Sequence, residues 1–259
     1  LIISQLGIEK TAGTFQVAAG VSILLGLLSF ALPNTPPKGK GEKANALAIL
    51  GTDAFVLFKT RSFFIFFISA ILICIPLSFY YGFANPFLNE IGLQNAAGKM
   101  TLGQVSEAIF ILAIPFMFNR VGVKNMLILG VSAWLLRYVF FAYGNMDTSW
   151  MLYAGIILHG ICYDFFFVTG YMYTEKKAGE KIKNAAQGLF TFATYGVGMF
   201  IGTKYSGYVV DQNKITDAVV GAVQHNWATI WLTPAAIAGA VLIAFILFFN
   251  EKKETSATN

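Results

Sequence analysis

Long apolar runs alternate with short polar segments along this chain, and each run has the length that crosses a lipid bilayer. A bilayer core about 30 Å thick needs about 20 apolar residues per helix. We find seven such runs, at Thr14–Pro33, Ser62–Phe83, Thr101–Phe118, Asn125–Tyr143, Trp150–Tyr173, Gln187–Val209 and Trp227–Phe249. The third is the shortest and the most polar. The pattern predicts an all-α integral membrane protein with seven transmembrane helices.

Composition and charge agree with a membrane protein. The 259 residues are 56% hydrophobic and only 12% charged, about half the charged share of a soluble domain. The net charge of +5 comes from basic residues at the ends of apolar runs, so nucleic acid is not an expected partner. Cys74 and Cys162 both lie within apolar runs, which argues against a disulfide framework or a CxxC metal site. We expect no metal and no other cofactor.

The basic residues predict which loops are cytoplasmic. Most of the 18 Lys and Arg residues fall in alternate connecting segments, such as 38–61 and 176–183. Cytoplasmic loops carry such an excess, so the first residue is expected outside and the last inside. Within the first basic loop, Ala44–Lys59 is amphipathic enough for a short interfacial helix.

These patterns predict four parts of unequal size. Residues 1–33 would be the last helix of a truncated N-terminal half, and 34–61 a basic cytoplasmic loop. Residues 62–250 would form a six-helix C-terminal half, followed by a cytoplasmic tail at 251–259. The chain begins at Leu1, without Met or a basic signal segment, so we expect it to be a truncated piece.

Two acids, Glu107 and Asp164, lie inside predicted spans. A charged acid at the bilayer centre costs about 2.5–3.5 kcal/mol, and such residues usually mark a substrate or proton pathway. Gln104 and Glu107 are three residues apart and share one helix face, where they offer donors and acceptors to a hydroxyl-rich or base-like ligand. The alternative is that this pair lies near the outer end of its span and meets headgroup water.

The fifth span contains aromatic side chains close in sequence to its acid, Asp164. His159, Tyr163 and Phe167 follow one another at intervals of four and fall on one helix stripe. Aromatic faces on such a stripe can stack on a planar ligand. His159 can equally be a core histidine. The adjacent Phe165 and Phe166 are expected to pack against lipid or neighbouring helices.

Arg137 is a third charge inside a predicted span. An arginine cannot neutralise itself, so it needs an acidic or carbonyl partner, and Asp164 and Glu107 are the acids at similar depth. The pair would be a structural ion pair that locks helices together, or a coupling pair that forms and breaks during transport.

Two further spans carry polar or small residues at helical spacing. Ser78 and Tyr81 share a face in the second span, whose backbone ladder is interrupted by Pro76. Such a helix is suited to a gate or pocket wall. In the sixth span, Gly198 and Gly202 form G-x-x-x-G, which permits close helix packing.

Several of these segments resemble a known family. The stretch HGICYDFFFVTG at 159–170, together with Gln104–Glu107 and Trp134–Tyr138, resembles the nucleoside–proton symporters of the major facilitator superfamily. The loop Asn119–Lys124 is similar to that superfamily's D-R-x-G-R-K loop, with Asn and Val at two of its positions. The resemblance implies a twelve-helix fold of two halves, of which this chain would hold helices six to twelve.

The resemblance also implies a site. It places Gln104, Glu107, Tyr163 and Asp164 among nucleoside or proton contacts. Ser78 and Tyr81 lie nearest to the positions where the family turns amide side chains toward the nucleoside.

The predicted function is proton-coupled uptake of nucleosides across a bacterial cytoplasmic membrane by alternating access. Glu107 or Asp164 would accept the proton, and the proton gradient would supply the energy. The expected partners are a nucleoside or other small polar ring substrate, the lipid bilayer and the missing N-terminal half.

Three alternatives belong to other classes of substrate or protein. A sugar or oligosaccharide symporter would use the same rings and acids. A membrane enzyme is disfavoured, because His159, Cys162 and Asp164 do not share one tight helix face and no HExxH or GxSxG motif occurs. A seven-helix receptor or retinal pump is disfavoured by the acids within the spans and by the absence of a Lys in the last span.

Overall fold

The computed structural model describes residues 6–8, 11–35, 51–216 and 223–250 and divides into two compact units, Leu1–Asn45 and Ala46–Asn259. The first unit contains one apolar helix, α2 (Gly13–Ser29), and none of its side chains is buried. The first predicted run is therefore helical. The lysines of the predicted basic loop, at 38, 40 and 43, lie outside the described residues, as does the tail at 251–259.

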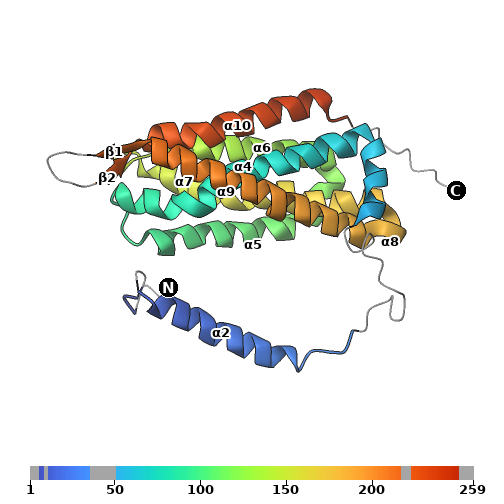
Figure 1. Ribbon diagram of the computed structural model, residues 1–259, viewed down its shortest axis with the longest axis horizontal. Helices are drawn as coiled ribbons and strands as arrows, with labels where there is room; N and C mark the ends of the chain where they lie inside the picture. Colours follow the sequence, from blue (N-terminus) through green and yellow to red (C-terminus); the bar gives the residue numbers. More distant parts are fainter. Residues whose placement is uncertain (1–5, 9–10, 36–50, 217–222, 251–259) are drawn as a thin grey trace. The chain divides into compact units, whose positions relative to one another are not determined.

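The second unit is a bundle of long helices (Figure 1). It opens with a short 3-10 helix, η1 (Thr52–Lys59), which occupies the second part of the predicted interfacial helix, whereas 44–50 lie outside the described residues. Three single helices follow, namely α4 (Arg61–Glu90), α5 (Ala96–Val121) and α6 (Val123–Tyr143). The last is α10 (Trp227–Phe248).

Between α6 and α10 the chain is helical almost without a break. This stretch consists of α7 (Ser149–Tyr163), η2 (Asp164–Val168), α8 (Thr169–Thr191), η3 (Phe192–Gly198) and α9 (Met199–Gln212). The segments η2 and η3 are π-helical. Gly179 has φ 66° and ψ 178°, a backbone conformation that glycine adopts without steric cost. The stretch turns there and contributes two crossings.

Within the described residues, five helical stretches are long and apolar enough to cross a membrane, and one of them is the 64-residue stretch Ser149–Gln212 that turns at Gly179. With the shorter α2, all seven predicted runs are helices. The prediction of an all-α membrane protein is confirmed, including the weak third run, which corresponds to α5.

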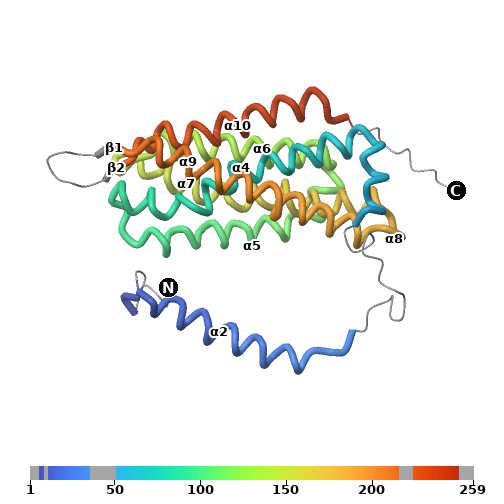
Figure 2. Tube along the Cα trace, viewed as in Figure 1, coloured from blue at the N-terminus to red at the C-terminus, as the bar shows by residue number. Residues whose placement is uncertain are grey.

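The helices of the second unit form a chain of neighbours in the order α5, α7, α6, α10, α4 and α9 (Figures 1 and 2). Glycines permit two of the closest approaches. A Cβ added at Gly198 would lie 2.8 Å from Cys74 Cβ, and one at Gly202 would lie 2.9 Å from the Cys74 oxygen. The G-x-x-x-G pair therefore packs against α4, as predicted.

Aromatic rings fill the core between these helices. The rings of Phe66 and Phe190 stack with centroids 5.2 Å apart. Phe165 meets Phe110 edge-on at 5.7 Å, and Phe166 packs on Phe66 at 6.3 Å. Phe165 and Phe166, which we expected to pack against lipid or neighbouring helices, thus contact neighbouring helices.

A two-stranded antiparallel hairpin precedes α10, formed by β1 (Lys214–Thr216) and β2 (Val223–His225). The carboxylate of Glu90, the last residue of α4, holds this hairpin. Its Oε1 accepts from the His225 backbone N–H at 2.7 Å, and its Oε2 lies 2.7 Å from the His225 Nδ1 atom. The hairpin and the end of α4 are therefore joined by two hydrogen bonds.

Candidate functional site

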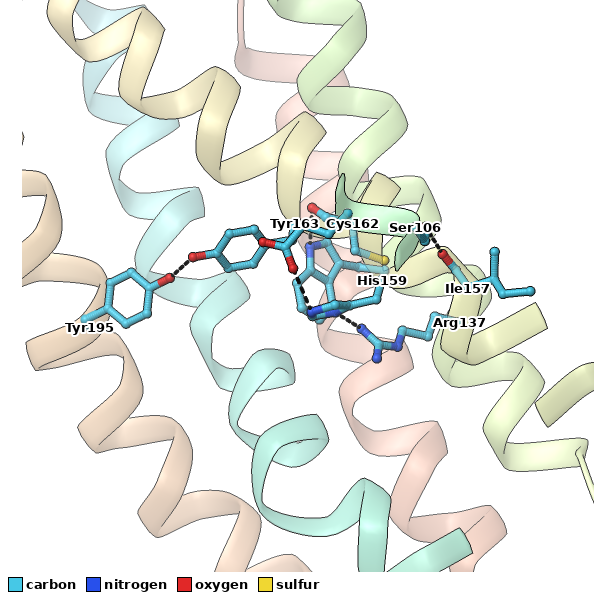
Figure 3. Close-up of polar contacts among 9 residues, drawn as sticks. Ser106, Arg137, Ile157, His159, Cys162, Tyr163 and Tyr195 are labelled. Atoms are coloured by element: carbon cyan, nitrogen blue, oxygen red, sulfur yellow. Dashed lines mark hydrogen bonds and ion pairs between the residues drawn. The ribbon is translucent and has the colours of Figure 1, made fainter. Parts of the chain in front are cut away.

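Arg137, in the second half of α6, is fully buried. Its guanidinium carbon lies 3.3 Å from the centroid of the Tyr80 ring. Its Nη1 lies 3.0 Å from Nδ1 of His159 (Figure 3). A cation over an aromatic face is stabilised by the quadrupole of the ring, and more so when it is desolvated. The structure therefore gives Arg137 a ring and a histidine as partners, in place of the acid that we expected from the sequence.

His159 lies between Arg137 and Glu107. It projects from α7, is 3% exposed, and stacks on Tyr80 with centroids 5.1 Å apart. Its Nε2 lies 3.7 Å from Oε2 of Glu107, whose side chain is 32% exposed. Residues from three helices thus form a row that runs from the bundle core to an accessible carboxylate.

Close contact between α5 and α7 brings Glu107 to the histidine. A Cβ on Gly103 would lie 3.2 Å from the Cβ of His159, and one on Gly160 would meet the backbone of Ser106. The Ser106 hydroxyl donates to the Ile157 carbonyl at 2.5 Å (Figure 3). Small residues and one interhelical hydrogen bond therefore set the position of this acid.

Asp164 is the second acid of the site and begins the π-helical segment η2. Its side chain is fully buried, and among the described residues neither carboxylate oxygen has a hydrogen-bond partner. It lies within electrostatic reach of Glu107. Single π-helical turns inside α-helices occur frequently at functional sites.

Two residues of α6, Trp134 and Gly130, lie against the backbone at and just before η2. The Trp134 Nε1–H donates to the Cys162 carbonyl at 3.1 Å. A Cβ on Gly130 would lie 2.9 Å from the Phe166 backbone nitrogen, so only a residue without a side chain allows α6 to approach so closely.

A pair of tyrosines links the end of α7 to the π-helical segment η3. The hydroxyl groups of Tyr163 and Tyr195 are hydrogen-bonded to each other (Figure 3). Phe167 packs on both rings, with centroids 5.3 Å from Tyr163 and 6.2 Å from Tyr195. The predicted stripe of His159, Tyr163 and Phe167 is present as consecutive ring contacts. Tyr195 was not among the predicted site residues, although its spacing from Thr191 in the sixth run was a signal.

The residues predicted on α4 separate into two environments. Ser78 is buried and donates to the Cys74 carbonyl at 2.9 Å, with the Met199 sulfur at 3.4 Å, so it packs between α4 and α9. Tyr81 is 51% exposed and lies within electrostatic reach of Glu107 and Tyr163. Gln104 on α5 is exposed as well.

Pro76 interrupts the hydrogen-bond ladder of α4, yet the helix continues to Glu90. The Tyr138 hydroxyl from α6 donates to the Pro76 carbonyl at 2.5 Å. That carbonyl therefore has a buried partner on a neighbouring helix, and in this conformation it is not a free group on a pocket wall.

The site combines an accessible acid, a buried acid and hydroxyl-bearing rings. It can take up and release protons and can stack on and hydrogen-bond a polar ring. Among the described residues, no group of three or more His, Cys, Asp or Glu side chains is placed to hold a metal ion. The apolar helices are long enough to cross a membrane and carry ionisable groups at their centre, which defines a multi-pass membrane protein with polar groups inside its bundle.

Comparison with known proteins gives the family. The chain belongs to the nucleoside H+ symporter family, whose pattern matches residues 1–254. YegT of Escherichia coli (strain K12) is 40% identical over 96% of this chain and 59% of its own length. The xanthosine permease of the same organism is 34% identical over 96% of this chain and 61% of its own length.

A solved structure shows the same arrangement of helices. The crystal structure of the nucleoside transporter NupG superposes with a TM-score of 0.78 and 32% sequence identity, covering 97% of this chain and 64% of that chain. This chain therefore spans somewhat less than two thirds of the length of the proteins that it matches. The family resemblance seen in the sequence is confirmed.

Proposed function

We propose that this chain forms the C-terminal part of a proton-coupled nucleoside transporter of a bacterial cytoplasmic membrane. In this proposal, 62–250 are the C-terminal half, and helices preceding this chain supply the other wall of the substrate site. The observation that carries the proposal is a partly exposed acid, Glu107, within electrostatic reach of a buried acid, Asp164, both in the family's membrane-crossing bundle. The printed names of the nucleoside permease NupG and the xanthosine permease support the substrate class.

In the proposed site, aromatic rings bind the base by stacking and polar groups bind the nucleoside by hydrogen bonds. Tyr163 and Tyr195 offer aromatic faces for the base, and such stacking contributes about 1–3 kcal/mol per base in nucleic-acid sites. Phe167, which was predicted as a further contact, is fully buried and packs against both tyrosine rings. Gln104 and Tyr81, which are both exposed, offer hydrogen bonds to ribose hydroxyls or base edges.

Coupling follows from the cost of burying charge. A proton taken up from outside by Glu107 or Asp164 neutralises the acid, which removes the penalty for enclosing it between the two halves. Release of the proton inside restores the charge, and rocking of the halves alternates access to the substrate. The proton gradient supplies the energy, so neither a cofactor nor an enzymatic step is required.

Glu107→Gln tests this proposal in the complete transporter, purified into vesicles. Gln keeps the shape of the side chain but cannot exchange a proton. We expect accumulation of labelled uridine against its gradient to fall at least about tenfold, because coupling is lost, while exchange of internal for external uridine continues. Glu180→Gln is the matched control, because that side chain is 84% exposed.

Undiminished proton-driven accumulation by Glu107→Gln would overturn the assignment of Glu107. If free sugars inhibited the uptake of labelled uridine and unlabelled nucleosides did not, the result would favour the sugar symporter over the nucleoside transporter.

A further inference from the structure

The contact between Arg137 and His159 fixes where the imidazole proton is. All hydrogen-bonding groups of a guanidinium are donors, so a ring nitrogen 3.0 Å from Nη1 must accept. The Nδ1 atom of His159 therefore carries no proton in this contact. The single proton of the neutral ring is then on Nε2, which is the nitrogen that faces Glu107 at 3.7 Å.

The surroundings of the ring hold it in this orientation. Tyr80 of α4 stacks on both the guanidinium and the imidazole, at 3.3 Å and 5.1 Å from its centroid. Gly103 of α5 presses against the Cβ of His159, and the ring is almost fully buried. A flipped ring would turn a carbon toward the guanidinium and lose the hydrogen bond.

The charged and titratable groups around His159 come from each helix packed on it. Arg137 approaches from α6, Glu107 from α5 and Tyr80 from α4, and Tyr163 follows on its own helix with its ring 5.9 Å away. The Cys162 thiol lies beside the guanidinium. A second proton on the imidazole would have to point at the guanidinium and would break that contact.

We propose that His159 is a positioning residue that presents a fixed N–H to Glu107 and does not carry the transported proton. The 3.7 Å separation is too long for a hydrogen bond. When Glu107 is ionised, its carboxylate moves toward Nε2 and accepts that hydrogen bond; when Glu107 is protonated, the gap stays open. Arg137 thereby favours the charged form of Glu107 through the ring, without touching it. This inference rests on the proposed role of Glu107 as the proton carrier.

Nitrogen NMR of the complete transporter with 15N-labelled histidine tests the fixed tautomer directly. This chain contains only one other histidine, His225, and the signal lost in His159→Gln is assigned to His159. We expect a neutral ring with its proton on Nε2 from about pH 5 to about pH 8, the interval in which an ordinary histidine changes its charge. An imidazolium signal from His159 at a pH where transport is active would overturn the proposal.

A pair of substitutions tests the positioning role. The amide of His159→Gln can accept from Arg137 and donate to Glu107, so we expect proton-driven accumulation within about threefold of the unaltered protein. His159→Phe keeps a ring but removes both polar contacts. Because a hydrogen bond to a charged group is stronger than one between neutral groups, we expect at least a tenfold loss of accumulation and a displaced pH profile, with uridine exchange retained.

Ile157→Val on the same helix is the control, because its side chain is 46% exposed and the change removes one methylene group. Equal loss of exchange and accumulation in both His159 variants would show that His159 contacts substrate, which overturns the proposal. An unaltered transporter that moves no nucleoside would refute the proposed function instead, and the tautomer measurement would still decide the state of His159.

Discussion

Arg137 and Asp164, the two charged residues of the site that are fully buried, differ in their partners. Arg137 rests on the Tyr80 ring and donates to His159, whereas both oxygens of Asp164 have no hydrogen-bond partner among the described residues. A buried polar group without a partner destabilises the fold by about 1–3 kcal/mol. A group retained at such a cost is better explained by function than by stability.

Asp164→Asn separates these two roles. The amide fills the same space without a charge, so we expect the thermal unfolding temperature in detergent to stay unchanged or rise. Proton-driven accumulation of uridine should fall at least about tenfold, because an amide exchanges no proton in this range.

Asp147→Asn in the exposed loop before α7 is the matched control and should alter neither quantity. If Asp164→Asn lowered the unfolding temperature as strongly as a core substitution while accumulation persisted, Asp164 would be a structural residue.

At the level of helices, small residues decide which elements touch. Gly202 meets the α4 backbone so closely that an added Cβ would lie 2.9 Å from Ile75 Cα. Gly207, on the same helix α9, has nothing within 4 Å of an added Cβ. Gly202 lies against another helix and Gly207 does not, so substitutions at the two positions form a matched pair of experiments.

Gly202→Ala should force α9 away from α4 and destabilise the bundle by about 1–3 kcal/mol, the usual effect of overpacking. Gly207→Ala should be neutral or stabilise by up to about 1 kcal/mol, because alanine favours helix. Thermal unfolding of both variants in the same detergent measures the difference. A loss at Gly207 equal to that at Gly202 would show that helix flexibility, and not contact, is what glycine provides.

The helices themselves could be predicted from hydropathy, because a membrane span needs only length and apolar side chains. The boundaries of α6 and α10 differ from the predicted Asn125–Tyr143 and Trp227–Phe249 by no more than two residues. The π-helical segments could not be predicted. The i→i+5 hydrogen bonds of η2 occur where its backbone lies close to Gly130 of α6, and sequence periodicity along one helix carries no information about its neighbour.

The sequence singled out candidate site residues but did not predict their pairings. Glu107, His159 and Asp164 stood out because polar groups are rare in apolar runs. The partner of Arg137 was assigned by charge alone, whereas the fold offers an uncharged acceptor closer by. Ser78 was grouped with Tyr81 by helical spacing, yet three residues turn a helix by about 300°, which leaves room for Ser78 to face α9.

For the molecule as a whole, the site faces outward from this chain. Tyr81 and Gln104 are exposed, and Glu107 is partly exposed. Transporters of this kind bind substrate near the bilayer midplane between two halves. We expect vesicles that contain only these 259 residues to accumulate no uridine, and vesicles with the complete transporter to do so.

The control for that comparison is the amount of folded chain, measured by circular dichroism and by protease resistance of the bundle. Accumulation by the 259-residue chain alone would mean that the site needs no second wall, which would contradict the two-half arrangement.

The clasp between Glu90 and His225 has a mechanical consequence. It joins the end of α4 to the strand that leads directly into α10, and those two helices also pack against each other. Tilting of α4 at that end must carry α10 with it, so the two helices move as one rigid body. Movement of helices relative to one another at this end would then have to come from the remaining helices.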